Sequence, residues 1–151
     1  MALKLSWSIE GEKKLLRKLR NIGEGVKDWT PAFEKASTKL KDIFSNDVFK
    51  TRGAVIGESW QPLKPKYLAQ KRRQGYVDDP LIKTGLMKSS FVSEVTKDYA
   101  IISNTAEYFK YHQSNKPRNK IPRRVMMKID NPQKTMIVRE FQVYWYKITH
   151  K

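Results

Sequence analysis

A stripe of apolar residues at helical spacing between positions 30 and 53 constrains the fold more than any other feature of the sequence. Thr30 and Pro31 supply an N-cap and a first helical residue, and Gly53 marks the end of the pattern. Apolar stripes of this kind are usually core, which favours burial within the domain over a membrane-surface or partner-binding helix. The stripe consists of Phe33, Ala36, Leu40, Ile43, Phe44 and Val48.

The residues before this helix predict a short strand and another amphipathic helix. Apolar and polar residues alternate from Leu3 to Ile9, as in a strand with one buried face. Leucine and isoleucine then recur at helical spacing from Leu15 to Ile22, and Gly23 ends that pattern. The N-terminal part is therefore expected to contribute one strand and two helices.

Residues 84–113 predict a β-hairpin between two short helical segments. Thr84 can cap a short helix, and residues 106–113 indicate a second short helix or turn. Between them, β-branched and aromatic residues in the range 91–102 flank a turn at Lys97, which favours a hairpin.

Two further patterns lie in the C-terminal part. Val125, Met127 and Ile129 alternate with other residues, which predicts another strand. Residues 133–149 carry a helical stripe, while part of this segment also alternates as a strand does; we favour the helix and leave the strand open. The expected class is α+β, with two N-terminal helices packed on a small antiparallel sheet, long basic loops and a C-terminal helix.

Two basic segments separate these elements. Periodicity disappears between Gly53 and Pro80, which predicts a long loop with one helical turn around residues 66–71, and no acid occurs from 59 to 77. Residues 114–124 form a second basic loop, also without acids.

The chain carries 31 Lys and Arg against 15 Asp and Glu, a formal net charge of +16. Such a surface attracts nucleic acid or an acidic protein partner, or it serves solubility alone.

The chain is long enough to bury one core. With 151 residues, of which 39% are hydrophobic, it is expected to fold as a single domain over residues 1–151. The absence of cysteine excludes disulfides and thiolate metal sites. No apolar run approaches the roughly 20 residues of a membrane helix. Residues 1–10 lack the apolar stretch of a signal peptide, so we expect a soluble cytoplasmic protein without membrane contact.

Catalytic and metal-binding patterns are absent from the sequence. His112 and His150 stand in none of the metal-ligand spacings, and no Gly-rich phosphate loop or nucleophile-elbow serine occurs. Asp78 and Asp79 are the only adjacent carboxylates and could serve acid–base chemistry or magnesium binding. They precede Pro80, which is more typical of a turn. We therefore expect no enzymatic activity, no cofactor and no metal site.

Four sequence segments follow one another in a distinctive order. They are GESWQPLKPKYLAQKRRQGY at 57–76, PLIKTGLMKSSF at 80–91, the Ala106-Glu107-Tyr108 to His112-Gln113 segment, and IPRRVMMKI at 121–129. In this order and spacing the chain resembles the phage virion morphogenesis family, which includes the tail-completion proteins of Mu-like contractile phages. The family-like part covers about residues 49–129 of one tail-completion-like domain.

The resemblance implies a structural protein that completes the tail or joins it to the head through protein–protein contacts. It further implies a ring, with six subunits as the expected number, between the tail tube and the head connector. Its partners would be other copies of the chain and other phage tail or head-connector proteins. The expected location is the head–tail junction or tail end of the virion, and the host cytoplasm during assembly.

A basic nucleic-acid-binding protein is the alternative. The net charge, the basic loops and four nearby tyrosines, Tyr67, Tyr76, Tyr108 and Tyr111, favour this alternative. However, no helix-turn-helix, zinc-finger or RRM signature accompanies them. A ring around the DNA path could combine both functions through non-specific DNA contacts, because phosphate contacts need no sequence readout.

We expect the interface to combine stiff apolar anchors with basic side chains. Trp60 either docks on a neighbouring subunit, where aromatic anchors dominate the binding energy, or packs into its own core, and both alternatives stay open. The basic stretches Lys64 to Arg73 and Lys116 to Arg124 are expected to face an acidic partner or the DNA path, because neither contains an acid that would cancel its charge. The candidate interface residues are Trp60, Pro62, Leu63, Lys64, Lys71, Arg72, Arg73, Tyr108, His112, Arg123 and Arg124.

Overall fold

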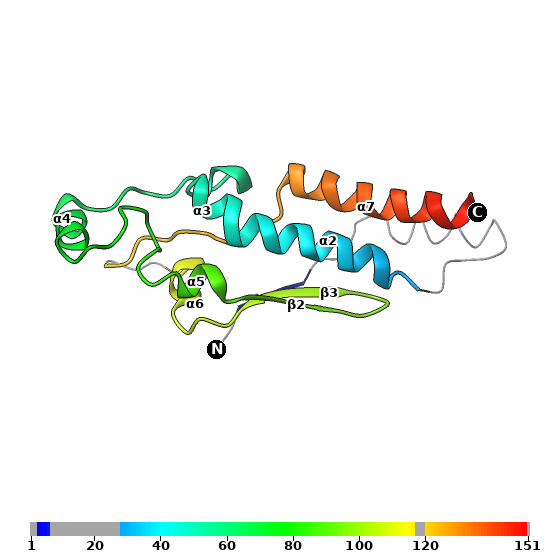
Figure 1. Ribbon diagram of the computed structural model, residues 1–151, viewed down its shortest axis with the longest axis horizontal. Helices are drawn as coiled ribbons and strands as arrows, with labels where there is room; N and C mark the ends of the chain where they lie inside the picture. Colours follow the sequence, from blue (N-terminus) through cyan, green and yellow to red (C-terminus); the bar gives the residue numbers. More distant parts are fainter. Residues whose placement is uncertain (1–2, 7–27, 117–119, 151) are drawn as a thin grey trace.

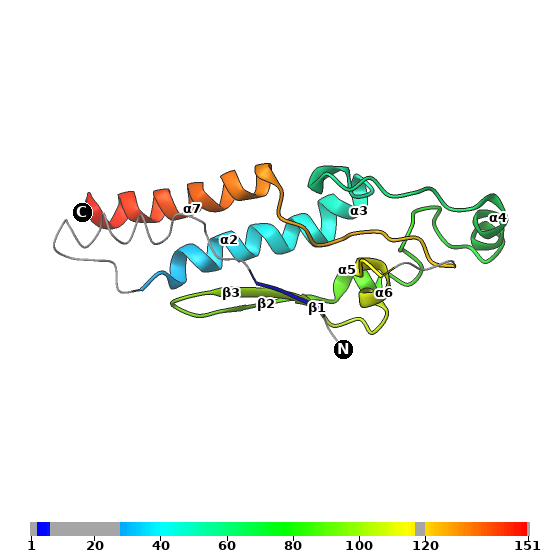
Figure 2. The same ribbon diagram turned by 180° about the vertical axis from the view of Figure 1, so that it is seen from behind.

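Helix α2 (Thr30–Asp42) lies between helix α7 (Asn131–Thr149) and a small β-sheet (Figure 1 and, from behind, Figure 2). The computed structural model describes residues 3–6, 28–116 and 120–150. The predicted helix from Leu15 to Ile22 lies outside the described residues. The layers of the described part are therefore a helix, a second helix and a sheet, in that order.

The helix predicted between positions 30 and 53 is confirmed. A π-helical turn (Ile43–Asp47) and the short helix α3 (Val48–Lys50) continue α2 without a break. The predicted N-cap is wrong by one residue, because Trp29 is the N-cap and Thr30 is already helical. The Asp28 carboxylate accepts the free Thr30 N–H at 2.9 Å, which supplies the capping hydrogen bond from outside the helix.

Helix α2 buries the side chains that face its two neighbouring layers, α7 and the sheet. Leu40 is fully buried within the helix. Toward α7, the Phe33 ring meets the Phe141 ring edge-on, with centroids 4.9 Å apart. Where the helix continues, Phe44 faces Phe91 of the sheet, with ring centroids 6.3 Å apart. Burial of each such side chain contributes about 1.5–3 kcal/mol to folding, so this row of residues forms the core.

The described sheet has three antiparallel strands in the order β1-β3-β2. β2 (Phe91–Val95) and β3 (Ala100–Asn104) form the predicted hairpin, and the Thr96 hydroxyl accepts two backbone N–H groups within its turn. β1 (Leu3–Ser6) pairs with β3, which confirms the opening strand over these four residues. Helices combined with an antiparallel sheet confirm the α+β class.

Helix α4 (Pro65–Arg73) lies at the end of the molecule opposite the C-terminus (Figure 1). The sequence predicted a long loop with one helical turn between Gly53 and Pro80, whereas the structure has nine helical residues there and a 3-10 turn (Ala54–Ile56). The prediction fell short because α4 buries only Lys71, so no apolar stripe marks the helix in the sequence.

Two short helices lie at the end of the sheet nearest α4 (Figure 1). These are α5 (Leu86–Ser89) and α6 (Phe109–Gln113), and they confirm the two predicted short helical segments. The fully buried Asn104 side chain links both regions, since it donates to the Met87 carbonyl at 2.7 Å and accepts the Ala106 N–H at 3.0 Å.

The strand predicted at residues 125–129 is wrong. This segment has no strand assignment and pairs with no neighbouring strand of the described chain. Val125, Met126 and Met127 are buried in succession, so the apolar alternation does not separate a core face from a solvent face. Side chains from other segments take the hydrogen bonds that a neighbouring strand would otherwise provide.

The C-terminal segment is helical, which excludes the strand alternative for residues 133–149. Asp130 and Gln133 form a capping box at the start of α7, in which the Gln133 side chain accepts the Asp130 N–H at 3.0 Å. The side chains of Ile137 and Phe141 are buried and pack α7 against the core. An ion pair between Lys39 and Glu140 joins α7 to α2.

Two glycines with the same left-handed backbone offer a matched stability test. Gly53 has φ +84°, and an added Cβ would lie 2.0 Å from the Glu58 carbonyl oxygen and 2.6 Å from Trp60 Nε1. Gly75 has φ +75° with nothing within 4 Å. Alanine at either position costs about 1–2 kcal/mol for the left-handed conformation. The clash at Gly53 adds about 1–3 kcal/mol.

We therefore expect Gly53→Ala to lower the free energy of unfolding clearly more than Gly75→Ala does. Urea unfolding followed by circular dichroism measures both values. Equal losses for the two variants would show that the Glu58 and Trp60 contacts do not constrain the backbone at Gly53.

Candidate functional site

The extended segment 121–130 is held by side chains rather than by a sheet. The Gln113 side-chain oxygen accepts the N–H groups of Met126 at 2.9 Å and Met127 at 3.1 Å, and its nitrogen donates to the Met127 carbonyl at 2.6 Å. Trp60 Nε1 donates to the Val125 carbonyl at 2.7 Å. The Gln113 amide thus forms the backbone hydrogen bonds that a neighbouring strand would form in a sheet.

Trp60 packs into the core of its own chain, which is the second of the two alternatives left open by the sequence. Its side chain is buried, and its ring meets the Phe49 ring edge-on with centroids 5.5 Å apart. Together with the hydrogen bond to Val125, this packing leaves Trp60 without the exposed surface that a docking anchor needs.

Two of the predicted interface cations are buried and bind backbone carbonyls. Lys71 donates from Nζ to Asp79 at 2.7 Å and to Ile82 at 2.8 Å. Arg124 donates from Nε and Nη2 to the Gln61 carbonyl at 3.2 and 3.0 Å. Burial lowers the pKa of Lys71 and that of Arg124. Both side chains therefore hold loops together, and the expectation that their charges face outward is wrong.

Arginines of the stretches Lys64 to Arg73 and Lys116 to Arg124 are paired with acids that lie outside those stretches. Arg72 binds Asp78 at 2.6 Å, and Arg123 lies 3.7 Å from Glu58. The hydrogen bond from Arg72 lowers the pKa of Asp78. The expectation that no acid cancels these charges is wrong for Arg72, whereas Arg123 shares Glu58 with Lys128, which lies closer to it at 2.8 Å. Absence of acids within a stretch of sequence does not exclude acids that fold against it.

The two adjacent carboxylates bind separate arginines. Asp78 pairs with Arg72, while Asp79 accepts a hydrogen bond from Arg52 at 3.0 Å. Both carboxylates thus lie in ion pairs around the turn that leads into Pro80, in agreement with the turn favoured by the sequence.

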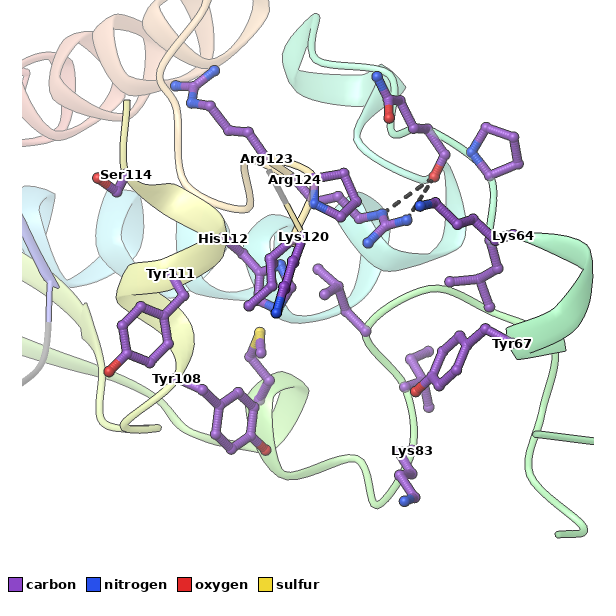
Figure 3. A pocket seen from close by; sticks show the side chains of 18 of the residues that line it. Lys64, Tyr67, Lys83, Tyr108, Tyr111, His112, Ser114, Lys120, Arg123 and Arg124 are labelled. Atoms are coloured by element: carbon purple, nitrogen blue, oxygen red, sulfur yellow. Dashed lines mark hydrogen bonds between the residues drawn. The ribbon is translucent and has the colours of Figure 1, made fainter. Parts of the chain in front are cut away.

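A cavity of about 1040 Å³ opens between α4, α5, α6 and the segment 120–124 (Figure 3). The predicted interface residues line it, except for Trp60, Arg72 and Arg73. The structure thus brings together most of the predicted set: Pro62, Leu63, Lys64, Lys71, Tyr108, His112, Arg123 and Arg124.

The walls of this cavity carry exposed tyrosines and lysines. Tyr67 and Lys83 lie on one side and Tyr108 and Tyr111 on the other, with Lys120 between them (Figure 3). The three tyrosines are 44%, 39% and 37% exposed, in the order of the chain. No acidic residue is present among the described residues that line the cavity. The cavity therefore combines positive charge with aromatic surface.

Sequence reasoning missed several lining residues. Lys83, Leu86 and Ile121 were not predicted as interface residues, although Leu86 is 50% and Ile121 38% exposed. The signal for Leu86 in the sequence is its place in the short helix predicted after Thr84, because a short helix has room for few buried side chains. Lys83 carries no such signal, because its position depends on how the segment after Pro80 folds back.

The described part of the chain contains neither a candidate metal centre nor a membrane-spanning helix. Within residues 3–6, 28–116 and 120–150, no group of three or more His, Cys, Asp or Glu side chains is arranged to hold a metal ion. No helix in this part of the chain is long and apolar enough to cross a membrane.

The sequence model of the phage virion morphogenesis family matches residues 11–142. The chain belongs to the phage virion morphogenesis family. This finding confirms the resemblance drawn from the four sequence segments. No curated protein and no solved structure gives a significant match to the chain.

The family-like segments of this virion morphogenesis protein meet around the extended segment 121–130. Trp60 belongs to the first segment and Gln113 to the third, and both bind backbone atoms of the fourth. Lys71 of the first segment binds Ile82 of the second. The four segments are therefore linked by hydrogen bonds that fix the walls of the cavity.

Proposed function

We propose that this protein completes the phage tail and joins it to the head through contacts between protein surfaces. Family membership supports a role in virion morphogenesis. The observation that carries the finer proposal is the cavity near α4, whose exposed tyrosines and lysines are suited to a protein contact. The proposed location is the head–tail junction or the tail end of the virion.

We propose further that the protein acts as a ring of identical subunits, with six as the expected number. β2 is an outer strand of the described sheet and exposes Val92. Helix α7 exposes Val138, Val143 and Tyr146. Exposed apolar side chains on an edge strand and on a helix support contacts between neighbouring subunits.

The proposed role involves no catalysis. Asp78 and Asp79, the adjacent carboxylates with acid–base potential, each bind an arginine. These ion pairs give both carboxylates a structural role at the turn before Pro80, which supports a protein that acts by binding alone.

A non-specific DNA contact is the second candidate, favoured by the net charge of +16. The ion pairs of Arg72 and Arg123 reduce the charge that the basic loops present. DNA contact is therefore proposed as an addition to the protein–protein role, along the path of the genome through the ring.

Disruption of the gene in the phage or prophage that carries it tests the proposal. We expect the disrupted phage to make heads and tails but no infectious particles, because the two parts do not join. A plasmid copy of the intact gene should restore the plaque titre. An unchanged titre after disruption would contradict the proposed function.

A further inference from the structure

We propose that the cavity beside α4 binds an acidic polypeptide segment with a large apolar side chain, contributed by a neighbouring protein of the virion. The proposal rests on the proposed function in naming a virion protein as the source of this segment. The charge, the lining and the size of the cavity support the proposal independently of that function.

The charge of the cavity selects a negative ligand. Lys64, Lys83 and Lys120 are exposed at its walls, and the lining contains no acid among the described residues. Charge complementarity of this kind steers the partner and excludes basic competitors. A segment rich in aspartate or glutamate is therefore the complement of this surface.

The apolar lining of the cavity favours a ligand that carries a large apolar side chain as well as negative charge. Leu63, Leu86 and Ile121 line the cavity together with the lysines and tyrosines, and the buried Met87 also contributes to the lining. Apolar anchors that fill such pockets supply most of the binding energy in protein interfaces. The bound segment is thus expected to carry a leucine, phenylalanine or similar residue among its acids.

The lining and the size of the cavity favour a polypeptide over nucleic acid. A volume of about 1040 Å³ is at the upper end of small-ligand pockets, which accept a short peptide but not a double helix. Phosphate contacts need positive charge alone and gain nothing from an aliphatic lining. A single strand stacked on the tyrosines is the competing occupant, and the experiment below includes it.

A second copy of the chain is a poorer occupant than another protein. The adjacent acids of this chain, Asp78 and Asp79, already bind Arg72 and Arg52. The net charge of +16 also opposes insertion of one copy into the basic cavity of another.

Fluorescence anisotropy with a labelled peptide tests the proposal at about 0.15 M salt, where the screening length is about 8 Å. The probe is a ten-residue peptide of glutamate and aspartate with one leucine and one phenylalanine. The cavity variant is Lys83→Glu with Lys120→Glu. The matched control is Lys35→Glu with Lys134→Glu, which makes the same charge change at exposed positions of α2 and α7 outside the cavity.

We expect the cavity variant to bind the peptide at least about tenfold more weakly than the wild type, and the control variant to lose only a few-fold in affinity. Serine in place of both apolar residues of the peptide should also weaken binding to the wild type. Equal losses in the two variants, or no effect of the serine peptide, would overturn the proposal, since net charge alone would then explain binding. Tighter binding of oligodeoxythymidylate at the same site would overturn it in favour of nucleic acid.

Complementation of the disrupted phage separates this proposal from the proposed function. If the cavity docks a virion protein, the cavity variant fails to restore plaques while the control variant restores them. Full restoration by the cavity variant would overturn the docking proposal and leave the proposed function intact. Failure of the proposed function is seen independently, as normal phage yield from the disrupted gene itself.

Discussion

Replacement of Gln113 with alanine is expected to lower the free energy of unfolding by about 3 kcal/mol or more. The substitution removes three hydrogen bonds to the backbone of Met126 and Met127, both of which are buried. Each buried backbone group left without a partner costs about 1–3 kcal/mol. Urea unfolding followed by circular dichroism measures this loss.

Two further variants define what the Gln113 amide contributes. Gln142→Ala, at an exposed position of α7, should change stability by less than about 0.5 kcal/mol. Gln113→Glu keeps an acceptor for the two N–H groups but places a carboxylate oxygen against the Met127 carbonyl, to which the amide donates at 2.6 Å. It should therefore also lower the free energy of unfolding clearly more than Gln142→Ala does. If Gln113→Ala were as stable as Gln142→Ala, the side chain would not hold the 121–130 segment.

Replacement of Trp60 with alanine is expected to cost about 3–5 kcal/mol of stability, as for other buried tryptophans. The ring packs edge-on against Phe49, and its N–H binds the Val125 carbonyl. Trp60→Phe keeps most of the packing but leaves that carbonyl without its donor. It should therefore cost less, about 1–3 kcal/mol.

The same variants decide between core packing and docking for Trp60. Tyr99→Ala serves as the control, because Tyr99 is 45% exposed at the turn before β3 and its loss should affect stability little. If Trp60 served only to dock a neighbour, Trp60→Ala would match Tyr99→Ala in stability and yet block assembly of the purified protein.

Periodicity predicted the elements whose buried side chains recur at regular spacing. The central helix is buried between two layers, so its apolar residues form the stripe from Phe33 to Val48 that predicted it. The alternation in residues 91–102 predicted the hairpin in the same way. The strand predicted at 125–129 failed although its apolar residues alternate. Its backbone groups bind Gln113 and Trp60, which lie 13 and 65 positions away in the sequence and show no periodic signal.

The candidate site was predicted in part because charge and aromatic content are visible in a sequence while pairing is not. Tyr108 and Lys64, both predicted from their chemistry as interface residues, line the cavity. Lys71 and Arg124 look equally exposed in the sequence but are buried, since their partners are backbone carbonyls that any residue could supply. Long-range pairs such as Lys128 with Glu58 are likewise hidden until the chain folds.

Electron microscopy of lysates from the disrupted phage tests the central proposal most directly. If the protein completes the tail and joins it to the head, the lysate contains filled heads and separate tails, and intact virions return when the gene is supplied from a plasmid. Micrographs that show normal numbers of joined virions without the gene would contradict the account.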